Sequence, residues 1–331
     1  MDCVSAPLTA HPRTAATSGS RWRWLTDGLL APTPAAVRRW ALAGVITSVL
    51  IILTGAAVRL SQSGLGCPDW PECTARSLVA TGATGDSLIH RWVEFGNRLV
   101  TTGITVVAIG VFVAVWRFRP PAGRRRDLLW LAAAQPGAIV IQIILGGIVV
   151  LTKLNPALVS VHFMSSVALV AATVALYVRC QEAGTPGRPL VPRPVRLAAL
   201  GVAGTVALMM TAGTVVTGTG PLAGAADVPR YHLPLEGVTQ LHADIGWLLA
   251  GLMAALLLGL RLSAAPHRAV RLGWLLLGLI ALQGVIGYTQ YFTGLPAGLV
   301  WFHVAGSVAI WVTAVLMPFA LRDRGSITTA D

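Results

Sequence analysis

Long apolar segments dominate this chain, and short polar links separate them. Eight such segments, bounded by charged residues or by Pro and Gly, lie at about 40–60, 88–116, 128–152, 157–178, 197–217, 238–260, 272–293 and 298–320. A helix of about 20 apolar residues crosses the hydrocarbon core of a bilayer, which is about 30 Å thick. The pattern predicts an all-α integral membrane protein with eight transmembrane helices.

The composition agrees with a location in a bilayer. Of the 331 residues, 55% are hydrophobic and 11% are charged, whereas charged residues make up about 25% of an ordinary soluble domain. The mean hydropathy is +0.70. These values exclude a soluble enzyme.

The placement of the basic residues predicts an orientation. Basic links follow the second, fourth and sixth segments, and they read RFRPPAGRRRD, RCQEAGTPGRPLVPRPVR and RLSAAPHRAVR. By the positive-inside rule these links and both termini are cytoplasmic, which predicts a multi-pass protein of the cell membrane. The cytoplasmic side then carries 19 of the 25 basic residues with six acids, a charge of +13, against −1 outside. The net charge of +12 is thus a topology signal and requires no nucleic acid.

An internal repeat predicts two similar units. Residues 142–168 align with residues 283–309 without a gap, and ten of the aligned pairs are identical. Two four-helix units of the same orientation, related by an axis along the membrane normal, would result. The expected divisions are a disordered cytoplasmic tail at 1–38, a first unit at 39–180, a cytoplasmic linker at 181–196, a second unit at 197–321 and a cytoplasmic tail at 322–331.

Four of the seven histidines lie at matched positions. His90, His162, His242 and His303 fall near the outer starts of segments two, four, six and eight, two in each unit. A lone histidine in a membrane helix is usually a helix-end residue or a polar contact between helices. Four at one depth favour heme, because imidazoles on facing helices of a bundle hold the iron from both sides. Zinc is less favoured, since His242 and His303 lack Cys or carboxylate partners at their depth.

The second segment carries the acid that is most costly to place in a membrane. Glu94 lies about two turns into that segment, and His90, Glu94 and Asn97 share one helical face. Two interpretations stand. Glu94 forms a structural ion pair with Arg91 or Arg98, or it is a functional carboxylate that faces the cavity of the first unit. The second is favoured because the second unit has no matching acid.

Further polar groups lie near the predicted outer surface. Gln142 and Gln283 recur at the same repeat position, where interhelical hydrogen bonds are expected and contact with a bound ligand is the alternative. Arg59, Arg91 and Arg98 lie at outer helix ends. Either snorkelling to the interface or binding of heme propionates accounts for these three arginines.

The first outer link contains two cysteines. Cys67 and Cys73 lie on the predicted oxidising side, which permits a disulfide across a loop stiffened by Pro68 and Pro71. The first interpretation is a purely structural disulfide. The second is a redox-active cysteine pair, exposed enough to exchange thiols with a reductant.

Several motifs taken together resemble the heme A synthase family. They are TGAAVRLSQSGLGCPDWPEC, VEFGNRLVTTG, LGGIVVLTKLNP followed by His162, GTVVTGTGP, QLHAD and the final His303. The resemblance covers about residues 40–320, and the combination is specific although no single motif is. It implies an eight-helix oxidoreductase with two similar halves. Such an enzyme oxidises the C8 methyl group of heme O to the formyl group of heme A by successive hydroxylations, for assembly of the terminal oxidase.

The resemblance also implies roles for single residues. The second half holds heme b between His242 and His303, and the first half receives heme O at His162. Glu94 matches the catalytic carboxylate of the family's Glu-x-x-His-Arg pattern. The expected partners are membrane lipid, a heme O synthase and terminal oxidase assembly proteins, and a homo-oligomer is compatible with the sequence.

The loop cysteines also match the family, whereas one position departs from it. Cys67 and Cys73 correspond to the family's loop pair. Asn97 precedes Arg98 where the family commonly has histidine, and asparagine is a poor ligand of heme iron. Either His90, about 10 Å higher on the same helical face, completes the first-half coordination, or His162 is the only strong ligand there.

Two other classes of function, an electron carrier and a transporter, share features with this sequence. A membrane heme-b electron carrier without porphyrin chemistry would need the four histidines but not Glu94. A parallel-repeat transporter would place polar sites at the bilayer midplane and would use broken helices. The polar residues here gather in the outer third of the segments, which disfavours a transporter.

Overall fold

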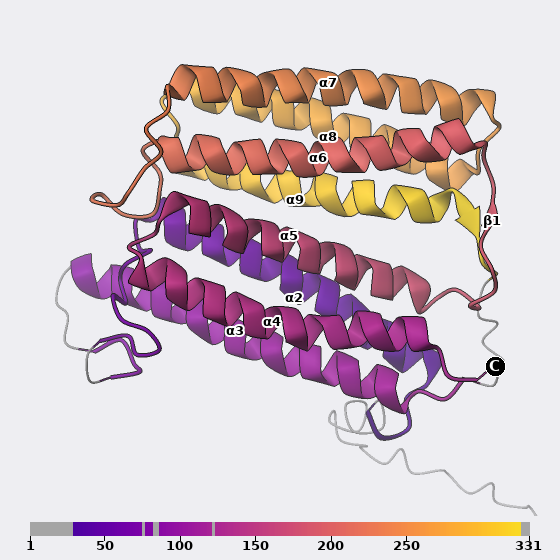
Figure 1. Ribbon diagram of the computed structural model, residues 1–331, viewed down its shortest axis with the longest axis horizontal. Helices are drawn as coiled ribbons and strands as arrows, with labels where there is room; N and C mark the ends of the chain where they lie inside the picture. The colour runs from indigo at the N-terminus through magenta and orange to yellow at the C-terminus, as the bar shows by residue number, and fades with distance from the viewer. Residues whose placement is uncertain (1–28, 75–76, 82–85, 121–122, 326–331) are drawn as a thin grey trace, which may run out of the picture.

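Eight long helices make up most of the part of the chain that the computed structural model describes, residues 29–74, 77–81, 86–120 and 123–325 (Figure 1). In chain order they are α2 (Pro34–Leu60), α3 (Asp86–Arg117), α4 (Arg126–Leu151), α5 (Pro156–Arg179), α6 (Arg193–Thr219), α7 (Leu235–Leu262), α8 (His267–Phe292) and α9 (Ala297–Ala320). Each is long and apolar enough to cross a membrane. The chain is an all-α, multi-pass membrane protein, as the apolar pattern predicted.

The helices run side by side along the long axis of the molecule. Figure 1 shows α2 to α5 gathered in one group and α6 to α9 in the other, and α9 contacts both α2 and α5 across the boundary. A small core of buried side chains fills this boundary. It contains Ile52, Val170, Val174 and Val308.

Two tryptophans of α9 hold the groups together. Trp301 donates its indole N–H to the carbonyl of Leu53 in α2 at 3.1 Å, and Trp311 donates to Val167 in α5 at 2.8 Å. Each bond joins residues far apart in the sequence. The groups are therefore tied at two levels along α9.

The first helix begins earlier than expected. The sequence predicted a tail through residue 38 and a helix from about residue 40, but α2 begins at Pro34, where Thr33 accepts the N–H of Ala36 at 3.2 Å. Val37 is buried in the core of the first group, while Arg38 and Arg39 face outward. Arg38 and Arg39 thus lie on the exposed side of a helical turn whose other side is buried. The rest of the predicted tail, residues 1–28, lies outside the described residues.

The turns after α4 and α8 have the same conformation. Lys153 and Leu154 have φ of 53° and 59°, and Gly294 and Leu295 have φ of 77° and 60°. In both turns a threonine hydroxyl, from Thr152 or Thr293, donates to the carbonyl four residues earlier at 2.7 Å. These residues lie within the aligned repeat of the sequence. The division into two repeated units stays a prediction.

The basic end of the molecule is closed by two short strands. β1 (Arg188–Pro189) pairs antiparallel with β2 (Arg322–Asp323). The sequence predicted a linker at 181–196 and a tail from 322, but α6 begins at Arg193 and residues 322–325 bond to the linker. Prolines are tolerated in the first turn of a helix, so Pro194 did not mark a loop. Residues 326–331 lie outside the described part.

Candidate functional site

Two histidines of the second group face each other. His242 lies in the first third of α7 and His303 in that of α9, and their ring centroids are 6.2 Å apart at an interplanar angle of 65°. The Nδ1 atom of each ring is enclosed and has no hydrogen-bond partner in the structure. A metal–imidazole bond is about 2 Å long, so this spacing is compatible with a single metal ion between the rings.

Glycines leave room beside these rings. A Cβ atom on Gly213 of α6 would lie 3.3 Å from Cε1 of His242, and one on Gly287 of α8 would lie 3.4 Å from Cε1 of His303. The first separation is tighter than ordinary van der Waals contact, and the second is at its lower limit. Each histidine is thus backed by the bare backbone of a neighbouring helix.

The first group contains one contact of this kind between a histidine and a glycine. A Cβ on Gly146 of α4 would lie 3.5 Å from Cε1 of His162 in α5. Gln142 donates to the carbonyl of His162 at 3.3 Å and to the hydroxyl of Ser166 at 2.8 Å. The interhelical bond predicted for Gln142 is therefore present, and it fixes the helical turn that carries His162.

The matched glutamine of the second group is held differently. Gln283 is buried, and its amide lies so close to Gly306 that a Cβ there would collide with it. Its Oε1 atom has no partner among the described residues. The two glutamines share a register position but not a hydrogen-bond pattern.

Several buried polar atoms of the first group also lack partners. They are Nδ1 of His162, Oδ1 of Asn97, Oε1 of Gln142 and Oγ of Ser165. Buried polar atoms in proteins are normally hydrogen-bonded, and exceptions need an explanation such as a missing ligand. Ser165 was not singled out from the sequence, where the only signal is that it is three residues after His162.

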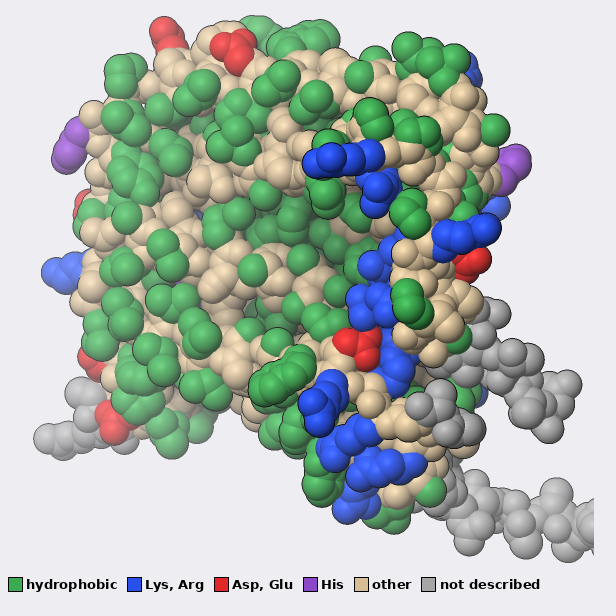
Figure 2. Space-filling model, turned by 45° about the vertical axis from the view of Figure 1, so that its right-hand side comes forward, with side chains coloured by type: hydrophobic (Ala, Val, Ile, Leu, Met, Phe, Trp, Pro, Cys, Tyr) green, Lys and Arg blue, Asp and Glu red, His purple; other side chains and the backbone are tan. Residues whose placement is uncertain are grey.

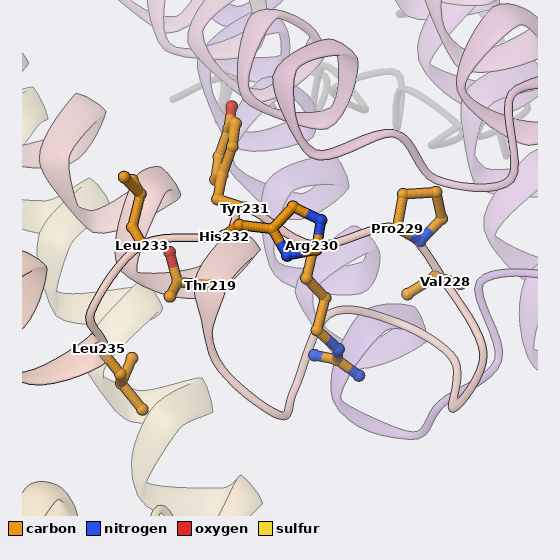
Figure 3. A pocket seen from close by; sticks show the side chains of 8 residues that line it. All are labelled: Thr219, Val228, Pro229, Arg230, Tyr231, His232, Leu233 and Leu235. Carbon is orange, nitrogen blue, oxygen red and sulfur yellow. The ribbon is translucent and has the colours of Figure 1, made fainter.

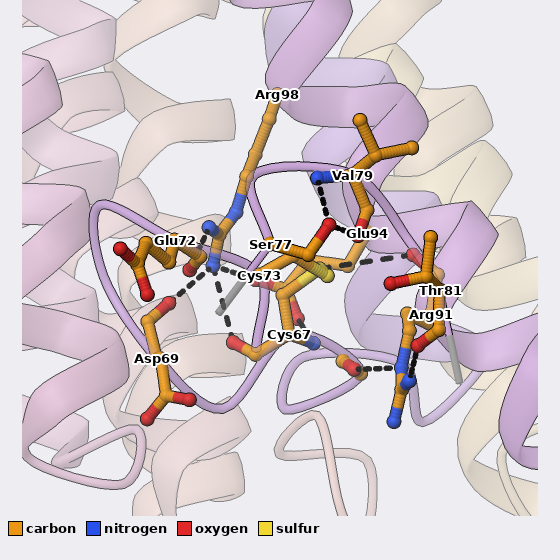
Figure 4. The surroundings of a disulfide bond; sticks show 11 residues. Cys67, Asp69, Glu72, Cys73, Ser77, Val79, Thr81, Arg91, Glu94 and Arg98 are labelled. Carbon is orange, nitrogen blue, oxygen red and sulfur yellow. Dashed lines mark hydrogen bonds and ion pairs between the residues drawn. A yellow bond between two sulfur atoms is a disulfide. The ribbon is translucent and has the colours of Figure 1, made fainter. Parts of the chain in front are cut away.

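Glu94 is enclosed by the loop between α2 and α3 (Figure 4). Its side chain is only 7% exposed, and it forms an ion pair with Arg98 at 2.7 Å through Oε1. Its Oε2 atom accepts the backbone N–H of Cys67, also at 2.7 Å. Of the two pairings that the sequence suggested, the structure has the one with Arg98. The carboxylate points at the loop between α2 and α3.

Arg98 holds the same loop in place. Its Nη1 and Nη2 atoms donate to the carbonyls of Glu72, Cys67 and Asp69 at 3.0–3.1 Å. The expected disulfide between Cys67 and Cys73 is present, and both cysteines are fully buried. The disulfide, Arg98 and Glu94 thus form one packed unit at the end of the first group that carries the loop between α2 and α3.

His90 and Arg91 are also engaged by loop residues. Nδ1 of His90 lies 2.9 Å from the hydroxyl of Ser63, and Arg91 donates to the carbonyls of Gly66 and Thr81. No pattern in the sequence indicated the bond to Ser63. It directs His90 toward the loop, whereas His162 lies against Gly146.

Arg59 lies where the outer loops of the two groups meet. Gly64 donates its backbone N–H to the carbonyl of Gly224 at 2.9 Å, and a Cβ on Gly224 would lie 3.7 Å from Cγ of Arg59. Within the described ranges, no acidic side chain lies within ion-pair distance of Arg59. The charge of its guanidinium is therefore not paired with a carboxylate of the described residues.

A cavity of about 580 Å³ opens in the loop between α6 and α7 (Figure 3). Arg230, Tyr231 and His232 line it, and Arg230 donates to the carbonyl of Gly220. His232 is exposed.

The glycine that backs His303 offers a test of the paired site. If a heme lies between these rings, as the sequence predicts, Gly287→Val should reduce the heme content of the purified protein about 5- to 150-fold, because overpacking costs about 1–3 kcal/mol and would displace the ring. The measurement is the heme absorbance per protein. Gly284→Val on the same helix is the matched control, since nothing lies within 4 Å of its Cβ position. Equal losses in both variants would contradict this role of Gly287.

Comparison with known proteins adds independent information. The sequence profile of the COX15-CtaA family, described as "Cytochrome oxidase assembly protein", matches residues 38–315. A protein of Shewanella oneidensis named "Heme A synthase" is 25% identical over 86% of this chain and 96% of its own length. A "Heme A synthase" of Bradyrhizobium is 25% identical over 88% of this chain and 92% of its own. One of Lysinibacillus sphaericus is 32% identical over 38% of each chain.

Proposed function

The chain belongs to the COX15-CtaA family of cytochrome oxidase assembly proteins, and from this membership and the site geometry we propose that it is a heme A synthase. It would be an oxidoreductase that converts the C8 methyl group of heme O to the formyl group of heme A. The observation that carries the proposal is the facing pair His242 and His303, whose Nδ1 atoms lack partners and whose rings are 6.2 Å apart. Such a pair suits an iron held from both sides.

In this proposal the second group binds heme b. His242 and His303 would be its axial ligands, and Gly213 and Gly287 leave space beside the rings. Heme, once bound, supplies a redox-active iron that the side chains of the protein do not. The protein contributes the two imidazoles, their fixed orientation and an apolar surrounding.

The first group would receive heme O as substrate. His162 is the histidine of this group that would face the substrate, because its ring lies beside Gly146 of α4. The ring of His90 is instead directed to Ser63. The unpartnered amide oxygens of Asn97 and Gln142 would accept hydrogen bonds from polar groups of the substrate, and the Ser165 hydroxyl would donate or accept one. Arg59 is the cation best placed for a propionate, since Arg91 and Arg98 already bond to loop carbonyls.

We propose that Glu94 is the acid–base group that accepts and donates protons during the reaction. A carboxylate enclosed in a membrane protein is costly unless it is paired or functional. Its Oε1 atom is the site for a proton, because the bond from Arg98 to Oε1 can be given up while Arg98 keeps three carbonyl partners. Cys67 N–H would meanwhile hold Oε2 in place.

The same proposal includes a topology and partners. The end that carries β1, β2 and most basic residues would face the cytoplasm, and the histidine and disulfide end would face outward. The cell membrane is the expected location. A heme O synthase would deliver the substrate, and terminal oxidase assembly proteins would take the product.

The test is heme analysis in a host that makes heme O but lacks its own synthase. After expression of this chain, extracted hemes are separated by reverse-phase chromatography, with an empty vector as control. We expect heme A, or its hydroxylated precursor, only in the cells that express the chain. If heme b is bound and neither product forms, the protein is a heme-b electron carrier and the proposal fails.

A further inference from the structure

A second cavity lies at the opposite end of the molecule from His242 and His303. It measures about 370 Å³ and lies between the start of α6, the end of α9 and the paired strands. Arg196, Arg322 and Arg324 line its polar side, and Leu200, Pro318 and Leu321 line its apolar side. Figure 2 shows arginine side chains gathered at this end around an acidic one.

The arginines of this cavity have unused hydrogen-bond donors. The Nε atoms of Arg196, Arg322 and Arg324 are buried and make no hydrogen bond in the structure, and that of Arg324 has only an ion-pair contact with Oε2 of Glu182, at 3.5 Å. Glu182 is shared by Arg322 and Arg324, at 3.1 Å and 3.5 Å, and it also lies 3.8 Å from Arg179. One carboxylate thus faces three guanidinium groups.

Positive charge remains in excess after this pairing. Arg196 has no ion pair within the described ranges. Burial, together with the charges of Arg179 and Arg322, lowers the pKa of Arg324. An anion placed between these guanidinium groups would relieve their repulsion and accept their free N–H donors.

The apolar side of the cavity identifies the kind of anion. Leu200 is 55% exposed on the outer surface of α6, and it lies seven residues, or about 10 Å, along the helix from Arg193. The cavity therefore extends from the level of the helix end toward the hydrocarbon. Its polar and apolar sides match a phosphate group that continues into acyl chains.

We propose that this cavity binds the headgroup of an anionic phospholipid, with Arg196, Arg322 and Arg324 around the phosphate and Leu200 against the first part of the acyl chains. Basic pockets at the ends of membrane helices are suited to such headgroups. A free phosphate shares the anionic chemistry but leaves the apolar side unused. The site is independent of heme binding, which takes place at the other end of the helices.

Native mass spectrometry of the delipidated full-length protein tests the assignment. Phosphatidylglycerol, phosphatidylcholine and inorganic phosphate are titrated in turn. We expect binding of phosphatidylglycerol about tenfold tighter than of phosphatidylcholine, and about a tenfold loss in Arg196→Gln, as for one charge-assisted hydrogen bond. Arg193→Gln, an exposed arginine one turn earlier on α6, is the matched control and should bind as the unmodified protein does.

A second variant should increase binding and so cannot be explained by misfolding. Glu182→Gln removes the carboxylate that competes for Arg322 and Arg324, and the affinity for phosphatidylglycerol should rise. Three outcomes would overturn the proposal. They are equal binding of the two lipids, equal losses in Arg196→Gln and Arg193→Gln, and an Arg196-dependent binding of inorganic phosphate alone.

Discussion

Glu94→Gln is expected to reduce formation of heme A at least about 100-fold, within the range attributed to a positioned acid–base group, while heme b remains bound. Glutamine has almost the shape of glutamate and can still accept the N–H of Cys67, but it cannot take up a proton at Oε1. The measurement is the heme A content of cells that supply heme O. The heme b spectrum of the purified variant is recorded in parallel.

The ion pair with Arg98 requires a control, because Glu94→Gln also removes one partner of an enclosed pair. Glu94→Asp keeps the charge and should restore part of the activity. A purely structural loss in Glu94→Gln would lower the thermal stability and the heme b content together with the activity, whereas a proton role leaves stability and heme b unchanged. Asp244→Asn removes an exposed acid of α7 that bonds to Gln240 and should leave heme A formation unchanged. Unaltered heme A in Glu94→Gln would refute the proton role.

His303→Ala is expected to abolish the low-spin heme b spectrum, and His242→Ala should do the same. Each variant leaves one imidazole opposite an empty space, and a single ligand does not hold the iron from both sides. The absorbance of the reduced, purified protein is the measurement. His232→Ala, in the exposed outer loop, is the control and should keep the spectrum. A normal spectrum in both site variants would show that the ligands lie elsewhere.

The fold followed from the sequence because its main signals are local. Runs of apolar residues indicated each of the eight helices, and the Pro and Gly residues between them marked most helix ends within a few residues. Errors arose where charge and helix coincide. Arg38 and Arg39 lie on the exposed side of α2 while Val37 packs inward, so a charged pair did not end the helix.

The site was only partly accessible from the sequence, because it depends on contacts between distant residues. The common depth of His242 and His303 suggested that they meet, and helical spacing placed Glu94 near Arg98. No spacing rule indicates that His90 bonds to Ser63, or that Glu94 accepts the N–H of Cys67. Both contacts depend on how the outer loop folds back over α3, which is a tertiary property.

The strand pair at the basic end also bears on the order in which the protein is made. Thr185 of the linker donates to the carbonyl of Arg324, which is 139 residues later in the sequence. A ribosome that adds about 5–20 residues per second needs about 7 to 28 seconds to cover that distance. During this interval the linker lacks its partner strand, because Arg322 and Asp323 have not yet been synthesised. Closure of the basic end therefore follows the synthesis of all four helices of the second group.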